Sequence, residues 1–222
     1  MRILLAGATG LVGQGVLHEI LADAAVTHVG LLGRRIVHHD DPRVQSLVVE
    51  RFDALDTIAD RLAPWDACFY CAGAPPVGTA ADEYRRVTVD LTLHVARTLA
   101  GRNPQGRFLY ISGANANPRS RLMPLRVKGE AETLLQTLPI STVMLRPGGV
   151  QPAHGERSPH AWMRPMYALG SPLMALGVRL LPGLMTSTAA IGRTMLALAA
   201  MPRPPSVVEN AEINRIAASA RA

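Results

Sequence analysis

The chain has 222 residues, 48% of them apolar, and a formal net charge of +6. This length fits one α/β domain, and the apolar content is ample for a core. No uninterrupted apolar run is long enough to cross a membrane, and the start does not read as a signal peptide. We therefore expect a cytoplasmic protein with no membrane span. Aromatic residues make up only 4%, which argues against a specific nucleic-acid partner.

The charge is unevenly distributed along the chain. Residues 1–100 hold nine Arg against twelve acidic residues, which gives −3. Residues 101–222 hold thirteen Arg and one Lys against five Glu, which gives +9. This asymmetry favours an anionic ligand or surface, and an arginine-rich genome would produce the same imbalance.

The N-terminal segment 7–13 (Gly-Ala-Thr-Gly-Leu-Val-Gly) follows a short apolar run, residues 3–6. This order predicts a strand, a glycine turn, and a helix from Thr9 or Gly10 to about residue 22. Free N–H groups and the positive dipole end at the start of such a helix suit a pyrophosphate. The sequence therefore predicts a dinucleotide site formed by the following residues: Gly7, Thr9, Gly10, Leu11 and Val12.

Strands and helices alternate after this motif. The sequence predicts strands at 28–33, 45–49, 67–71, 107–111 and 142–145, with helices at about 82–99 and 125–138. Continuous apolar strands between helices imply an α/β fold with a single doubly wound parallel sheet, Rossmann-like, over residues 1–150. The ligand crevice of such a sheet lies at the carboxyl ends of its strands.

The pattern changes after residue 150. A polar, proline-bearing loop precedes two expected helices, 162–184 and 186–201, the second capped by Thr186, Ser187 or Thr188. A late strand is expected at 207–210. We expect residues 151–222 to form a small C-terminal helical extension, packed on the same domain, that closes over the crevice and supplies its substrate side.

Two other clusters invite a chemical interpretation. Cys68 and Cys71 have the spacing of a redox pair, but they lie in an expected buried strand, where positions three apart face opposite sides. The segment 38–41 (His-His-Asp-Asp) is expected to be a solvated loop, since adjacent residues rarely converge on one ion. We therefore expect a reduced protein without a metal.

The choice of dinucleotide depends on the end of the second strand. An acidic residue there would bind both hydroxyls of the adenosine ribose, but the chain has Arg34 and Arg35 after Gly33. Guanidinium groups suit a phosphate, so we expect NADP to bind in preference to NAD. Asp53 is placed to meet the adenine, and Cys71, Ala72 and Gly73 are placed along the middle of the cofactor.

Lys128 is the single lysine among 23 basic residues, and it follows Ser112 in an expected helix. The chain resembles the short-chain dehydrogenase/reductase superfamily. The resemblance rests on these two residues, the glycine segment, Asp53 and residues 126–132 (Arg-Val-Lys-Gly-Glu-Ala-Glu). Within the superfamily, the chain resembles the atypical branch of Tat-interacting-protein-like and NmrA-like NAD(P)-binding proteins. The resemblance covers residues 1–150 well and the remainder loosely.

The resemblance implies a Ser, Tyr and Lys set at the nicotinamide end. Ser112 and Lys128 match it as catalytic residues, Lys128 also binding the nicotinamide ribose, whereas the Tyr position four residues before Lys128 holds Pro124. The usual proton donor is therefore absent. Tyr110 is expected to be a packed strand residue, and Tyr167 has no spacing that places it in the crevice.

Three functions remain open from the sequence. The first is an NADP-dependent oxidoreductase or epimerase-like enzyme of unknown substrate with a different proton donor. The second, which the missing Tyr favours over a conventional reductase, is a non-catalytic NADP(H) sensor or regulatory module that acts through a protein partner. The third is an interaction protein that attaches to membranes or anionic polymers through its basic second half. The sequence identifies neither the small molecule nor the partner protein.

Overall fold

The computed structural model describes residues 1–156, 181 and 183–220, without the side chain of Asp53. Its centre is a parallel sheet of seven strands in the order β3-β2-β1-β4-β5-β6-β9. The strands are β1 (Arg2–Ala6), β2 (His28–Gly33), β3 (Val44–Val48), β4 (Ala67–Tyr70), β5 (Arg107–Ile111), β6 (Ser141–Arg146) and β9 (Val207–Glu209). The order reverses between β1 and β4, which places a crevice at their carboxyl ends. The expected doubly wound sheet is confirmed.

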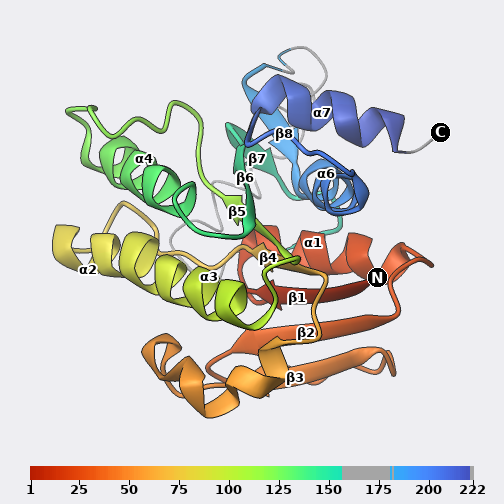
Figure 1. Ribbon diagram of the computed structural model, residues 1–222. Coiled ribbons are helices and arrows are strands. Elements are labelled where there is room, and N and C mark those ends of the chain that lie inside the picture. The colour runs from red at the N-terminus through yellow and green to blue at the C-terminus, as the bar shows by residue number, and fades with distance from the viewer. Residues whose placement is uncertain (157–180, 182, 221–222) are drawn as a thin grey trace.

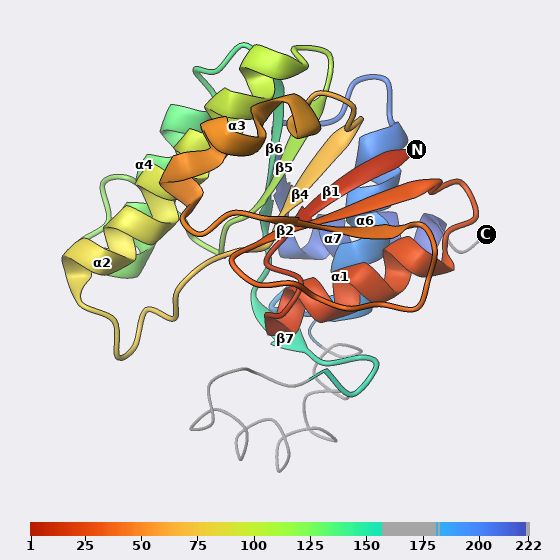
Figure 2. The same ribbon diagram turned by 90° about the horizontal axis from the view of Figure 1, so that it is seen from below.

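Helices cover both faces of the sheet (Figure 1). One face carries η1 (Phe52–Leu62), α2 (Ala81–Arg85), η2 (Arg86–Asp90), α3 (Leu91–Arg102) and α4 (Met123–Leu135). The other carries α1 (Leu11–Ala22), α6 (Thr188–Ala200) and α7 (Asn210–Ser219). Figure 2 shows the sheet between these two helical layers.

The core divides into two apolar clusters, one on each face, because successive strand residues point in opposite directions. Cys68 lies in the cluster under α3 and α4, whereas Cys71 packs on the cluster under α1 and α6. Both thiols are free, and they lie on opposite faces of the sheet, as expected. Tyr110 is fully buried on β5, as expected.

The helix expected at 82–99 is interrupted. Its middle turn, η2, is π-helical, between the α-helical segments α2 and α3. The helix η1 was not expected, because it is built from short 3-10 turns separated by non-helical angles at Ala54 and Ile58. Such turns lack the 3.6-residue periodicity by which helices are recognised.

Most of the expected helix 162–184 lies outside the described residues. At its end, however, residues 183–184 form a turn, and Met185–Ser187 form β8, which pairs with β7 (Gly149–Gln151) in a small second sheet. The second helix, α6, begins at Thr188, and the Ser187 side chain accepts a hydrogen bond from the Ala190 N–H. Ser187 is therefore the cap among the three candidates. The predicted late strand is β9, and α7, which follows it, was not expected.

Candidate functional site

The turn between β1 and α1 is shaped by two glycines that the fold itself requires. Gly7 has a φ of +85°, and a Cβ added there would lie 2.5 Å from the Ala72 backbone nitrogen. A Cβ at Gly13 would lie 2.0 Å from the Gly7 carbonyl oxygen. The first glycine therefore allows the turn and its contact with the end of β4, and the second allows α1 to lie on the turn.

Gly10 differs from these two glycines. Its φ of −78° suits any residue, and an added Cβ would come no closer than 3.4 Å to the Gly7 carbonyl oxygen. Gly10 is the N-cap of α1, where no side chain accepts a hydrogen bond and no acidic residue lies in the first turn. Packing does not require a glycine here; glycine suits an N-cap and leaves the backbone open to a ligand.

A groove runs along the carboxyl ends of β1 to β4 and has two adjoining hollows. The lower hollow, of about 630 Å³, is bounded by the glycine turn, the end of β2 and residues 71–73. The upper hollow, of about 810 Å³, lies between the ends of β2 to β4 and the helix that contains η2. They share Arg34, Phe52, Ala72 and Gly73. A Cβ on Gly73 would meet no atom within 4 Å, so the groove is open there.

Most of the expected dinucleotide residues meet in this groove. The lower hollow is lined by Gly7, Thr9, Gly10, Arg34, Arg35, Cys71, Ala72 and Gly73. Leu11 and Val12 do not line it; they form the first turn of α1 behind it. Asp53 is the second residue of η1, and its side chain lies outside the described part of the structure.

Arg34 and Arg35 follow directly on β2 and are both exposed. Neither forms an ion pair within the described residues. Arg35 lines only the lower hollow, whereas Arg34 lines both. Their guanidinium groups are therefore available to an anionic ligand in the groove.

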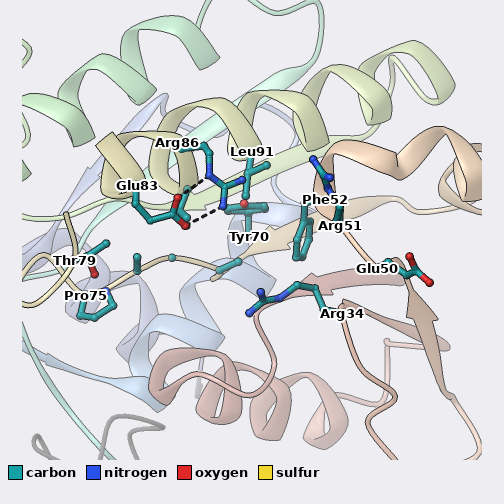
Figure 3. Close-up of a pocket in the computed structure, with 14 residues that line it drawn as sticks. Arg34, Glu50, Arg51, Phe52, Tyr70, Pro75, Thr79, Glu83, Arg86 and Leu91 are labelled. Atoms are coloured by element: carbon teal, nitrogen blue, oxygen red, sulfur yellow. Dashed lines mark hydrogen bonds and ion pairs between the residues drawn. The ribbon is translucent and has the colours of Figure 1, made fainter. Parts of the chain in front are cut away.

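Sequence reasoning missed the far wall of the upper hollow. Glu83 of α2 and Arg86 of η2 line it, and their side chains form a two-bond ion pair (Figure 3). Arg86 lowers the pKa of Glu83, and Arg34 adds a weaker electrostatic effect of the same sign. Phe52, at the start of η1, forms part of the same hollow. The helix predicted at 82–99 contains Glu83 and Arg86, but its apolar periodicity does not indicate that these two side chains line the groove.

Ser112 and Lys128 meet at the end of β5. The Lys128 Nζ donates a hydrogen bond to the Ile111 carbonyl oxygen at 2.9 Å and lies 4.9 Å from the centre of the Tyr110 ring. Ser112, the next residue after Ile111, is 6% exposed, and its Oγ has no hydrogen-bond partner within the described residues. An unpartnered buried hydroxyl is costly in a folded protein, so Ser112 is suited to receiving a polar ligand.

The surroundings of Lys128 disfavour the protonated, charged form of its amine. Burial lowers the pKa of Lys128 to about 8, although Glu132 opposes the shift. Burial raises the pKa of the nearby Cys71 thiol to about 12. Lys128 is therefore a partly neutral amine near pH 8, and Cys71 is a protonated thiol.

The position four residues before Lys128 holds no side chain that can donate a proton. Pro124 is the second residue of α4, where its missing N–H costs little. Burial raises the pKa of Tyr110 well above its usual value, so this phenol does not ionise at neutral pH. Tyr167 lies outside the described residues.

A separate cluster joins α1 to the segment after β7. The His154 Nε2 lies 2.8 Å from the Glu19 Oε1, and the His18 ring stacks on the His154 ring at 3.7 Å. These residues have the donor types of a metal site, but the other Glu19 oxygen already pairs with Arg193. The cluster therefore fastens the segment after β7 to α1.

The parallel sheet, the glycine turn and the groove define a Rossmann-type dinucleotide-binding protein. Protein HTATIP2 of Rattus norvegicus is 30% identical over 165 residues, which cover 72% of this chain and 67% of that protein. Protein FMP52, mitochondrial, of Eremothecium gossypii is 30% identical over 162 residues, covering 72% and 70%. The solved structure of MoeE5 in complex with UDP-glucose and NAD matches with a TM-score of 0.71 at 18% identity, over 99% of this chain and 81% of that one.

No protein-family model matches the chain. The chain belongs to the atypical short-chain dehydrogenase/reductase family that includes HTATIP2 and FMP52, an NAD(P)-binding family. The expected resemblance is confirmed. No helix within the described ranges is long and apolar enough to span a membrane.

Proposed function

We propose that the protein binds NADP(H) in the groove, in preference to NAD(H), and acts as an oxidoreductase or epimerase-like enzyme. The observation that carries the proposal is the lower hollow, in which the uncapped glycine turn and two exposed arginines face one space. A pyrophosphate fits the turn, and a second phosphate fits the guanidinium groups. A cytoplasmic location remains part of the proposal, although the name of the relative FMP52 places that protein in mitochondria.

The groove and the Ser112–Lys128 pair, which lines neither hollow, each have a role in this proposal. The pyrophosphate lies on the backbone of residues 7–12, with the adenine near Asp53 and the middle of the cofactor along residues 71–73. Lys128 binds the nicotinamide ribose, and Ser112 holds the reacting polar group of the substrate. The nicotinamide, when bound, supplies or accepts a hydride. The unpartnered Ser112 hydroxyl and the open space at Gly73 both fit such a ligand.

The first test is a thermal-shift titration of the protein with NADPH and NADH. The double variant Arg34→Ala/Arg35→Ala should lose most of the preference for NADPH, since each charge-assisted phosphate contact contributes about 1.5–3 kcal/mol. Arg97→Ala is the matched control, because Arg97 is exposed on α3 and lines neither hollow. Equal affinity of the wild-type protein for the two dinucleotides would refute the NADP preference.

The second candidate function is an NADP(H) sensor that acts through a protein partner. Pro124 favours it, because a proline side chain has no proton to transfer at that position of α4. A screen of carbonyl substrates that follows NADPH absorbance separates the two functions. Binding without turnover across many substrates would support the sensor.

Pro124→Tyr provides a sharper discrimination. It places a phenol four residues before Lys128, hence on the same face of α4. We expect turnover to change more than NADPH affinity, because the ring adds a proton donor without touching the glycine turn. Turnover and dissociation constants measured on both proteins check this. Loss of NADPH binding in the variant would show that the assumed alignment of α4 with the nicotinamide end is wrong.

A further inference from the structure

The Glu83 carboxylate pairs with one guanidinium group and interacts electrostatically with a second. It accepts hydrogen bonds from Arg86, from Nε to Oε2 at 2.7 Å and from Nη2 to Oε1 at 2.9 Å. Arg34 acts on the same carboxylate from the β2 side of the upper hollow. Figure 3 shows Arg34 extending into the hollow below the Glu83–Arg86 pair. A carboxylate held in this way occupies a position suited to an external anion.

The Glu83–Arg86 pair is open to water. The two side chains are 48% and 51% exposed, and an ion pair so open to water contributes little to stability. The π-helical turn begins at Arg86, in the wall of the hollow, and such turns are frequent at functional sites. Separating Glu83 from Arg86 therefore costs little stability.

The size and the other walls of the hollow point to the ligand. About 810 Å³ is available, and Phe52 and Leu91 give the hollow apolar surface next to the charged groups. A flat aromatic base that carries a nearby phosphate matches this combination. The hollow joins the glycine turn through Ala72 and Gly73, so one extended molecule can reach both.

The geometry points to a phosphomonoester subsite in the upper hollow, made by Arg34 and Arg86 together, with Glu83 as an internal competitor for the phosphate. This inference rests on the proposed function, because it takes the adenosine half of the dinucleotide to lie in this hollow. A phosphate on the adenosine ribose displaces the Glu83 carboxylate from Arg86. A dinucleotide without that phosphate leaves the ion pair intact.

This arrangement gives two neighbouring substitutions opposite effects. Glu83→Gln removes the competing charge, so a phosphorylated adenosine binds several-fold more tightly. Arg86→Gln removes one phosphate ligand, so the same nucleotide binds about tenfold more weakly. Neither substitution changes the binding of a nucleotide without the ribose phosphate by more than about twofold.

The experiment is isothermal titration of the full chain with 2′,5′-ADP and, separately, with 5′-ADP. The two ligands differ in the ribose phosphate, and neither contains nicotinamide, so turnover does not enter. Glu212→Gln and Arg215→Gln are matched controls, because Glu212 and Arg215 form an ion pair of the same i,i+3 spacing on α7. Neither control should alter the affinity for either ligand.

Three results would overturn the inference. One is an equal loss of affinity for both nucleotides in Arg86→Gln, and another is no loss for either. The third is weaker binding of 2′,5′-ADP to Glu83→Gln, which would mean that Glu83 positions Arg86 rather than competing for it. In each case wild-type binding of the nucleotides persists and the proposed function stands. A wild-type protein that binds neither nucleotide would instead overturn the proposed function and, with it, the subsite.

Discussion

The two ends of the candidate site are built in opposite ways. At the adenosine end, the charged side chains of Arg34, Arg35, Glu83 and Arg86 are exposed, and the backbone of the glycine turn is tightly packed. At the β5–α4 end, Ser112 and Glu132 are buried, and the amine of Lys128 is desolvated. Exposed charged groups at the adenosine end can therefore bind a ligand with little change in the free energy of folding. Buried charged groups at the β5–α4 end, in contrast, contribute to that free energy.

The strongest test of this contrast is Arg146→Met. Arg146 donates hydrogen bonds to Glu132 and also pairs with Glu209, and Glu132 is only 4% exposed. Removing Arg146 leaves a buried carboxylate unpaired, which should lower the free energy of unfolding by about 3–5 kcal/mol. Urea unfolding monitored by circular dichroism measures it.

Arg34→Met is the control from the adenosine end. Arg34 is exposed and makes no ion pair within the described residues, so its loss should change stability by no more than about 0.5 kcal/mol. Arg34→Met should weaken nucleotide binding more than Arg146→Met does. Equal destabilisation by both substitutions would remove the contrast between the two ends.

Alanine substitutions at Gly13 and Gly10 should differ in their effect on stability, by less than the effect of Arg146→Met. Gly13→Ala places a Cβ 2.0 Å from the Gly7 carbonyl oxygen, so it should destabilise the fold by about 1–3 kcal/mol. Gly10→Ala has room within the protein, so it should lower the unfolding temperature less than Gly13→Ala, through the poorer N-cap alone, while weakening dinucleotide binding. Thermal melts with and without NADPH check both variants. Unchanged NADPH binding in Gly10→Ala would show that the ligand does not approach that backbone.

The elements of the adenosine end that could be predicted are those set by local sequence. The glycine turn and the two arginines adjoin strands whose apolar runs are easily recognised, so their meeting at the carboxyl ends of the sheet follows from parallel topology. The proximity of Lys128 to the end of β5 was expected from family resemblance, and its contact with the Ile111 carbonyl oxygen agrees with it.

The rest depends on contacts between segments distant in the sequence. Arg34 and Glu83 are nearly fifty residues apart in the sequence. Their meeting in the upper hollow can be predicted only from the path of the segment after β4 across the groove. Phe52 lines the groove because 3-10 turns follow β3, and those turns have no clear sequence signature. The buried position of Glu132 depends on Arg146 of a neighbouring strand, which no single-segment pattern reveals.

The last predicted effect is the pH dependence that Lys128 adds to stability. Its pKa is about 8 in the folded protein and about 10.4 in an unfolded chain. Between these values the unfolded state binds more protons, so the Lys128 contribution to the free energy of unfolding rises with pH from about 8 to about 10.4 and is flat outside that window. Lys128→Met lacks this contribution.

The measurement compares wild type with Lys128→Met at several pH values, because other groups also titrate in this range. Burial raises the pKa of Cys71 and of Tyr110, and both effects lower stability as the pH increases. The Tyr110 contribution is common to both proteins and cancels in the difference between their free energies of unfolding. The Cys71 contribution differs between them, because Lys128 lowers the pKa of Cys71, but Cys71 titrates in the folded protein only near pH 12, above the window. That difference should shift in favour of the wild type between pH 8 and about 10.4. A difference that stays constant across the window would mean that the folded protein hydrates Lys128 as well as the unfolded chain does, and the contrast between the two ends of the site would then rest on Glu132 alone.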